Sequence, residues 1–272
     1  MENSIAHYVY GLARDRDAKV ITDALSRVAP PPHFGPFSLF PHDSVTLIAS
    51  PLSAAAFDGD REIRPARRTM LSHARVLEAI VTCAPVLPMQ FGVVCPNIAE
   101  IKSVSMKSED ALAELDRLEG RAEWGVRVAA DRDAMIAVLA SERPELRQAY
   151  RQAADRGAAG HYDRVELGRR VGRLLSERRA QAETALLRRL APLADAHKRK
   201  PHETDGEILR AEFLLPLNRE EAFAEAVAAA GAELATCDGV APNIRIVGPA
   251  PASHFVNLRI DLAASASRHG TA

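Results

Sequence analysis

Apolar and polar residues alternate in blocks that predict strands and helices along the first half of the chain. Residues 7–12 (HYVYGL) are rich in aromatic and β-branched side chains, which predicts a first strand. Apolar residues recur at helical spacing over 15–29 and over 65–83, which predicts two helices. Between these helices, 37–40 and 45–49 read as two strands joined by a polar turn.

The second predicted helix carries a histidine close to its apolar stripe. We interpret His73 as a hydrogen-bonded core residue that positions the loop after the helix, because buried polar groups find partners. The alternative is an imidazole that responds to pH or contacts a ligand. We expect the apolar stripe to consist of Met70, Ala74, Leu77 and Val81, with His73 and Ile80 beside it.

A proline interrupts the apolar segment that follows, 86–94 (VLPMQFGVV). Pro88 has no backbone N–H, so we do not expect this segment to be a central strand of a sheet. Ser108 is suited to begin another helix, because its side chain can cap the first turn. Gly120 is suited to end that helix.

The second half of the chain places a long helical stretch between predicted strands. Apolar residues at helical spacing extend over 158–196, although Gly168 and Gly172 lower the helix propensity and mark a place for a break. We expect a polar loop over 198–206. Further elements are strands over 124–129, 208–217, 244–248 and 254–260, a charged helix that starts near Asp131, and a helix over 219–230 that Asn218 caps.

This order of elements predicts an α+β protein with two domains. The later strands would form an antiparallel sheet with helices on one face, which is a ferredoxin-like arrangement. We expect an N-terminal α+β domain over 1–120 and a C-terminal ferredoxin-like domain over 121–262, into which the long helix 158–196 is inserted. Residues 263–272 are small and polar, which is typical of a loose tail.

Composition and charge narrow the function classes. The chain has 272 residues with a formal net charge of −1, whereas proteins that bind nucleic acid usually carry a basic surplus, so we expect no nucleic-acid partner. Its three cysteines match no zinc or disulfide pattern, which fits a reducing cytoplasm. No apolar run reaches the roughly 18 residues that span a bilayer, and the first residues lack a signal-peptide profile. We therefore expect a cytoplasmic protein that is not embedded in a membrane.

The sequence contains no phosphate-binding, dinucleotide-binding, hydrolase or zinc-protease motif. We therefore expect no catalytic residue, no cofactor and no metal. His197 and His202 stand on either side of Pro201, which fits solvated loop residues better than a metal site. Cys83 and Cys95 lie among apolar residues, and we interpret both as small hydrophobic residues rather than nucleophiles.

The long helix is rich in arginine, and two interpretations are open. It is a docking face for an acidic partner or for nucleic acid, or it is a solvated face that nearby carboxylates partly neutralise. Nucleic acid fits poorly, because aromatic residues are not interleaved with the arginines. The arginines are Arg164, Arg169, Arg170, Arg173, Arg178, Arg179, Arg188 and Arg189.

Four short motifs follow one another in an informative order. Residues 8–11 read YVYG, 86–92 read VLPMQFG, 123–127 read EWGVR, and a Gly-Pro segment that starts at Gly248 leads to Phe255. Together these motifs resemble the gas-vesicle accessory proteins of the F/L family. The resemblance extends over essentially the whole chain.

The resemblance implies a role in building gas vesicles, the hollow protein shells that make microbes buoyant. It implies a non-catalytic assembly factor or minor structural component that binds the hydrophobic shell protein and other accessory proteins. It further implies a two-domain protein with a ferredoxin-like C-terminal domain, located at the gas vesicle. The alternative is a small-molecule-binding protein or an enzyme on a ferredoxin-like sheet, because a fold does not fix a function.

Three segments are candidate protein-binding surfaces: the loop after the second helix, the arginine-rich helix, and the sheet edge near the end of the chain. Open sheet edges and helix faces are surfaces with which one protein covers the exposed strands or apolar patches of another. The residues are Pro88, Gln90, Phe91 and Gly92, then Arg169, Arg170, Arg173, Arg178 and Arg179, and finally Gly248, Pro249 and Phe255.

Overall fold

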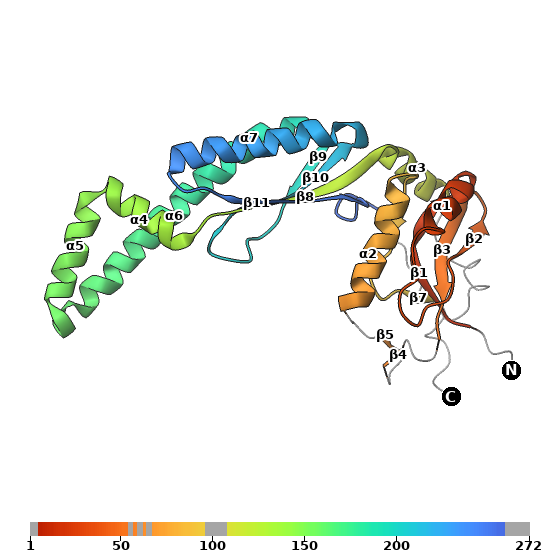
Figure 1. Cartoon of the computed structure of the whole chain (residues 1–272), viewed down its shortest axis with the longest axis horizontal. Coiled ribbons are helices and arrows are strands. Elements are labelled where there is room, and N and C mark those ends of the chain that lie inside the picture. The colour runs from red at the N-terminus through yellow and green to blue at the C-terminus, as the bar shows by residue number, and fades with distance from the viewer. Residues whose placement is uncertain (1–4, 54–56, 59–61, 64–66, 96–107, 259–272) are drawn as a thin grey trace. The chain divides into compact units, whose positions relative to one another are not determined.

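The structure, a computed structural model, describes residues 5–53, 57–58, 62–63, 67–95 and 108–258 (Figure 1). Contacts within the chain divide it into two units. The first unit contains the residues up to Glu123 together with the segment from Gly248 onward, and the second contains Trp124–Val247.

The first unit is built around a strand whose side chains are buried on both faces. In this strand, β1 (His7–Arg14), every residue after His7 is buried. It pairs in antiparallel fashion with β3 (Val45–Pro51), which pairs in turn with β2 (Ser38–His42). The predicted hairpin is therefore confirmed, and Asp43 in its turn has a positive φ of 53°.

Two very short strands, β6 (Leu87–Pro88) and β7 (Val94–Cys95), pair with the other side of β1. Both lie at the outer edge of the sheet, which confirms that the proline-containing segment is not a central strand. Gly11 of β1 is required here, because a Cβ at this position would lie 2.6 Å from the carbonyl oxygen of Leu87. A separate two-stranded sheet consists of β4 (Phe57–Asp58) and β5 (Glu62–Ile63).

The helices of the first unit lie where the apolar periodicity predicts them. In the described residues they are α1 (Ala18–Leu25), preceded by a 3-10 turn at Asp15–Asp17, α2 (Arg67–Val81) and α3 (Ser108–Leu118). Gly120 follows the end of α3 with a positive φ of 66°, as expected for a glycine that ends a helix.

The buried face of α2 differs from the predicted stripe. Met70 is 49% exposed and Ala74 is also exposed, so the prediction was wrong at these two positions. The buried face is rotated toward His73, because the imidazole finds hydrogen-bond partners inside the unit. The buried residues are Thr69, His73, Val76, Leu77, Ile80 and Val81.

The second unit has a ferredoxin-like order of elements. Its strands are β8 (Arg121–Ala129), β9 (Ala196–Arg199), β10 (Glu207–Pro216) and β11 (Asn243–Ala250). They lie in the order β11–β8–β10–β9, and helices connect β8 to β9 and β10 to β11. This βαββαβ arrangement confirms the predicted α+β fold with a ferredoxin-like sheet and a long helical insertion.

The connection from β8 to β9 contains α4 (Arg132–Glu142), α5 (Pro144–Asp155) and α6 (His161–Leu190). Asp131 caps α4 by accepting a hydrogen bond of 2.7 Å from the backbone N–H of Ala134. We did not predict α5 as a separate helix, although Pro144 in its first turn is a common start signal. The long helix α6 continues through Gly168 and Gly172, so these glycines do not break it. Short 3-10 turns occupy Gly157–Gly160 and Ala191–Leu193.

The last helix, α7 (Glu220–Asp238), extends further than predicted and begins differently. Asn218 was expected to cap it, but this residue lies inside a 3-10 turn, Leu217–Arg219, and no side chain caps the α-helix. Two carboxylates in the first turn still favour this helix start, because they complement the helix dipole. Gly239 ends the helix with a positive φ of 67°.

Two further predictions were wrong. Residues 196–199, partly assigned to a loop, form β9 at the edge of the sheet and pair with β10. The sequence hides this strand because His197, Lys198 and Arg199 are all exposed, as is usual for an edge strand. Residues 254–258 were assigned to a strand but have no regular structure, and the rest of that prediction lies outside the described residues.

The core of the second unit lies between its sheet and the helices α6 and α7, which cover one face (Figure 1). Phe213 of β10 packs on Phe223 of α7 with ring centroids 5.2 Å apart, and Trp124 of β8 is 2% exposed. Within the described part of the chain, every helix is too short or too polar to cross a membrane.

Candidate protein-interaction surfaces

Residues 88–92 form a loop that is fixed to the sheet of the first unit at both ends. The backbone N–H of Met89 donates to the carbonyl of Tyr10 at 2.8 Å. On the other side of the loop, the N–H of Val9 donates to the carbonyl of Val93 at 3.0 Å. The residues between these two bonds therefore lie beside β1 at the edge of the sheet.

A buried tyrosine and a buried histidine hold the same loop from inside the unit. The hydroxyl of Tyr8 lies 2.7 Å from Nδ1 of His73, and the N–H of Gly92 donates to that hydroxyl at 3.3 Å. The ring of Phe91 packs on both, with centroid distances of 6.2 Å to Tyr8 and 5.8 Å to His73. His73 is therefore a hydrogen-bonded core residue that positions the following loop, as we interpreted it.

The burial of this pair keeps both side chains uncharged. Burial lowers the pKa of His73 from 6.5 to about 4, although a hydrogen bond with the backbone of Met89 acts in the opposite direction. Burial also raises the pKa of the Tyr8 hydroxyl. Since neither group changes its charge near neutral pH, the pair acts as a fixed hydrogen bond that shapes the loop.

The four loop residues chosen from the sequence differ in exposure. Pro88 and Phe91 are half-buried, whereas Gln90 and Gly92 are exposed. Gly92 has a φ of +96° and nothing within 4 Å of the place a Cβ would take, so the backbone conformation rather than lack of space favours glycine. Gln90 is therefore the side chain that this loop presents to solvent.

The arginines of α6 do not form one uniformly basic face. Arg178 makes two hydrogen bonds of 2.8 and 3.1 Å to Glu142 of α4, and they lower the pKa of that carboxyl. Exposed ion pairs of this kind contribute little to stability. Arg169 pairs with Glu166 at 3.7 Å and Arg170 with Glu145 at 3.8 Å, whereas Arg173 and Arg179 have no carboxylate within 4.0 Å in the described part of the chain.

The segment at the end of β11 is partly exposed and partly buried. Gly248 is exposed and Pro249 is half-buried. Phe255 is 4% exposed, so its ring belongs to the core of the first unit and does not form part of a free surface. Among the three residues chosen from the sequence, Gly248 and Pro249 alone can meet a partner.

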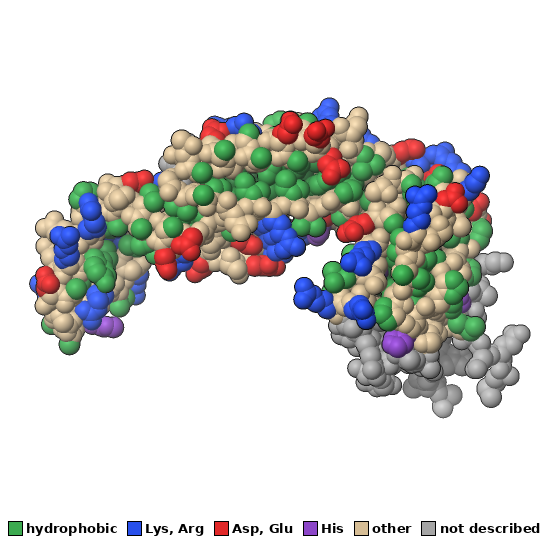
Figure 2. Space-filling model, viewed as in Figure 1, with side chains coloured by type: hydrophobic (Ala, Val, Ile, Leu, Met, Phe, Trp, Pro, Cys, Tyr) green, Lys and Arg blue, Asp and Glu red, His purple; other side chains and the backbone are tan. Residues whose placement is uncertain are grey.

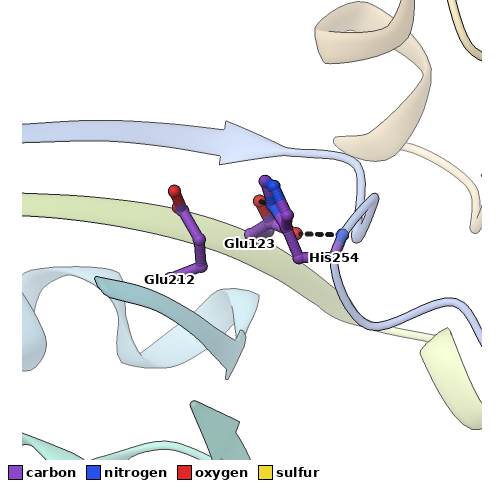
Figure 3. Close-up of side chains that lie close together, drawn as sticks. All are labelled: Glu123, Glu212 and His254. Atoms are coloured by element: carbon purple, nitrogen blue, oxygen red, sulfur yellow. Dashed lines mark hydrogen bonds and ion pairs between the residues drawn. The ribbon is translucent and has the colours of Figure 1, made fainter. Parts of the chain in front are cut away.

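Charged side chains of the first unit hold this segment by its backbone. Glu123, which is 5% exposed, accepts a hydrogen bond of 3.0 Å from the N–H of His254, and its other oxygen lies 2.5 Å from Nδ1 of the same residue (Figure 3). Figure 3 also shows Glu212 on β10, whose carboxylate would lie 2.8 Å from a Cβ at Gly125.

Two residues of α3 extend this arrangement, which we call the terminal clamp (Glu114, Arg117 and Glu123). Arg117 donates to the carbonyl of Phe255 at 2.6 Å, and Glu114 accepts from the N–H of Asn257 at 2.8 Å. The hydrogen bond from Arg117 also lowers the pKa of Glu114. We did not predict the clamp, because its partners lie more than a hundred residues away in the sequence.

The structure also shows the surroundings of His197, Cys83 and Cys95. His197 lies on β9, where its ring stacks on Phe213 with centroids 6.0 Å apart. Cys95 is buried, whereas Cys83 is exposed. Partial burial raises the pKa of the Cys83 thiol, which keeps it protonated and weakens it as a nucleophile.

Comparison with known proteins gives consistent matches. A family model described as "Gas vesicle synthesis protein GvpL/GvpF" matches residues 6–257. The chain is 28% identical over 222 residues to gas vesicle protein F of Streptomyces sp. (strain CB03234), covering 81% of this chain and 88% of that protein. It is 27% identical over 165 residues to gas vesicle protein F of Nostoc sp. (strain PCC 7120), covering 59% and 67%.

Solved structures share the same fold. The crystal structure of GvpF from Anabaena sp. PCC7120 matches 94% of this chain and 100% of its own length, with a TM-score of 0.74 and 20% identity. That of GvpF from Microcystis aeruginosa matches the same shares with a TM-score of 0.67 and 17% identity. At 20% and 17% identity, the structural similarity supports the fold alone. Membership of the family rests on the match to the family model.

Proposed function

The chain belongs to the GvpL/GvpF family of gas vesicle synthesis proteins, and on this basis we propose that it is a non-catalytic accessory protein of gas vesicle assembly. In this role it binds the hydrophobic shell protein and other accessory gas vesicle proteins in the cytoplasm or at the vesicle. The observation that carries the proposal is the family match over residues 6–257, which includes both units.

A physical reason for such a protein follows from the chemistry of a water-excluding wall. A shell subunit must expose apolar surface and strand edges before it is incorporated, and such surfaces aggregate. An accessory protein can cover them by adding a strand at a sheet edge or by offering a helix groove. In the first unit, the loop 88–92 lies at a sheet edge and presents Gln90, which makes it the first candidate contact.

Two sets of buried polar side chains make hydrogen bonds within the chain, which fits a binding role. Tyr8 and His73 hydrogen-bond each other and the loop backbone, and Glu123 binds the backbone and ring of His254. In each case the polar atoms hold the chain in place. An enzyme instead directs such groups toward a pocket where a substrate can meet them.

Deletion and complementation in a gas-vesicle-forming host test the proposal. Cells that lack this chain and its close relatives are expected to form few or no buoyant vesicles, and wild-type chain restores them. Purified chain is expected to retain the shell protein in a pull-down. Normal flotation of the deletion strain, together with no retention of any gas vesicle protein, would rule the proposal out.

A matched pair of variants tests the loop. Gln90→Glu places a charge on the exposed loop and is expected to weaken retention of the shell protein. Lys19→Gln makes the same change of net charge at an exposed position of α1 and is expected to leave retention unchanged. Equal retention by both variants would remove the loop from the contact surface and leave the assembly role to the deletion experiment.

A further inference from the structure

The hairpin formed by α5 and α6 carries charged side chains on two flanks. A hollow of about 630 Å³ lies between the two helices. It is lined by three carboxylates, Asp155, Asp163 and Glu166, together with Arg156 and Arg170. The fourth, Glu145, pairs with Arg170 at 3.8 Å and so belongs to the same flank. The carboxylates of residues 144–173 are Glu145, Asp155, Asp163 and Glu166.

A second flank of the hairpin carries two arginines and a tyrosine of α5. Arg147, Tyr150 and Arg151 are three and four residues apart, so they share one side of α5. Ala149 and Gln152 lie on a different side of α5, where they line the hollow. Tyr150 is 64% exposed, and in the described residues neither Arg147 nor Arg151 has a carboxylate within 4.0 Å.

One side of α6 carries an apolar stripe that is exposed at Val165 and Gly168, and its third residue, Gly172, also lines a hollow with charged residues. Val165, Gly168 and Gly172 follow one another at spacings of three and four residues, so they form one stripe. Val165 is 40% exposed. Glycine lowers helix propensity, yet nothing lies within 4 Å of a Cβ built at Gly168 or Gly172, so no contact inside the chain requires glycine here. The stripe leaves room for the backbone of another molecule to approach α6.

We propose that this flank (Arg147, Tyr150 and Arg151 of α5 with Val165, Gly168 and Gly172 of α6), the Tyr150 flank, binds an acidic segment of a partner protein. Two guanidinium groups beside an exposed tyrosine fit a segment in which carboxylates flank an apolar side chain, because tyrosine and arginine commonly anchor protein interfaces. Residues 144–173 hold seven arginines against four carboxylates, whereas the whole chain has a net charge of −1. Residues 144–173 therefore carry a local surplus of positive charge.

An acidic protein segment fits this flank better than a nucleic acid does. Proteins that bind single-stranded nucleic acid present several aromatic rings along a basic groove. This flank offers Tyr150 between two arginines, and the other exposed tyrosine of the hairpin, Tyr162, lies at the start of α6. Figure 2 shows the α5–α6 hairpin with basic side chains around apolar ones. The proposal rests on the proposed function in one respect, because the natural partner is taken to be another gas vesicle protein.

Binding measurements with defined probes test the proposal. The probes are each purified gas vesicle protein of the host, a synthetic peptide in which glutamates flank leucine, the same peptide with lysines, a single-stranded oligonucleotide, and vesicles that contain phosphatidylserine. The test variants are Arg147→Glu/Arg151→Glu and Tyr150→Ala. The control, Arg132→Glu/Arg188→Glu, makes the same change of charge at two exposed arginines elsewhere in the second unit.

Wild type and control are expected to bind one gas vesicle protein and the glutamate peptide, more weakly at high salt. The double variant is expected to lose roughly tenfold or more in affinity for both, because the charges become alike. Unchanged binding by the double variant overturns the proposal. The proposal is also overturned if Arg147 and Arg151 bind the oligonucleotide or the vesicles but do not bind the glutamate peptide.

The two proposals can fail separately in this experiment. Binding of the glutamate peptide through Arg147 and Arg151, without binding of any gas vesicle protein, supports the flank and contradicts the proposed function. Binding of a gas vesicle protein that is equally tight in the double variant supports the proposed function and overturns the flank. Circular dichroism of every variant establishes that the exposed substitutions leave the fold intact.

Discussion

The hydroxyl of Tyr8 lies 2.7 Å from Nδ1 of His73, although 65 residues separate the two in the sequence. This bond joins β1 to α2, and the N–H of Gly92 adds the loop to the same hydroxyl. Tyr8 is fully buried and His73 is 8% exposed, so bulk water cannot replace a partner that is removed. The position of an exposed loop thus depends on a buried pair.

Removal of the Tyr8 hydroxyl is expected to destabilise the first unit. Tyr8→Phe keeps the ring but leaves Nδ1 of His73 and the N–H of Gly92 without their partner, which costs about 1–3 kcal/mol of unfolding free energy. Urea denaturation measures this difference. Tyr150→Phe, at an exposed tyrosine, is the control and is expected to change little. Equal stability of Tyr8→Phe and wild type would contradict the buried bond.

Acid is expected to destabilise the protein through His73. The pKa of this imidazole is 6.5 in the unfolded chain and about 4 in the fold. Between these values the unfolded state binds a proton that the folded state does not, so the unfolding free energy falls as the pH falls from 6.5 toward 4. The uncharged His73 contributes about 3 kcal/mol to the unfolding free energy above pH 6.5, and this contribution is lost as the pH falls to about 4.

The variant His73→Gln isolates this effect. It cannot bind the proton, so its stability is expected to depend less on pH than that of wild type between pH 6.5 and about 5, above the range where most carboxylates titrate. Urea denaturation at several pH values gives both slopes. Identical slopes would show that His73 titrates in the fold as it does in the unfolded chain.

Two glycines are expected to respond to alanine in opposite directions. Gly92→Ala forces a side chain into a positive φ of 96° and is expected to cost about 1 kcal/mol or more. Gly168→Ala adds a methyl group to an exposed helix where nothing lies within 4 Å, and is expected to stabilise by up to about 1 kcal/mol. Thermal unfolding of both variants measures the signs. If the unfolding temperature rises in both variants, or falls in both, the two backbone conformations are contradicted.

Truncation of Phe255 is expected to weaken the first unit. The ring is 4% exposed, and Phe255→Ala removes it from the core at a cost of about 3–5 kcal/mol. Phe255→Leu refills part of the space and is expected to cost less. Val247→Ala, at a 47% exposed residue, is the control. A Phe255→Ala variant as stable as this control would show that the segment is not packed.

The sequence predicts elements well where one periodicity dominates. The first strand, the hairpin and the helix α2 carry clear alternating or helical patterns, and the structure confirms all three. The strand β9 was missed because an exposed edge strand has polar side chains on both faces. The helix α5 was missed because no end was predicted for the charged helix that starts near Asp131, and Pro144 was the available signal that separates α5 from α4.

The candidate surfaces could be predicted only in part. The role of His73 followed from its place beside the apolar stripe of α2, just before the loop that it positions. The terminal clamp could not be found, because Glu114 and Glu123 meet their partners only after the chain has passed through the second unit. The two flanks of the α5–α6 hairpin likewise depend on how the helices pack against each other, which residue spacing within one helix does not reveal.

The terminal clamp also sets an order of events during protein synthesis. Glu114 binds the backbone of Asn257, which the ribosome adds 143 residues later. While the second unit is being translated, α3 is already present but the segment it holds has not been made. The nascent first unit therefore has an uncovered site for Phe255, and it reaches its native state only after this segment has been made.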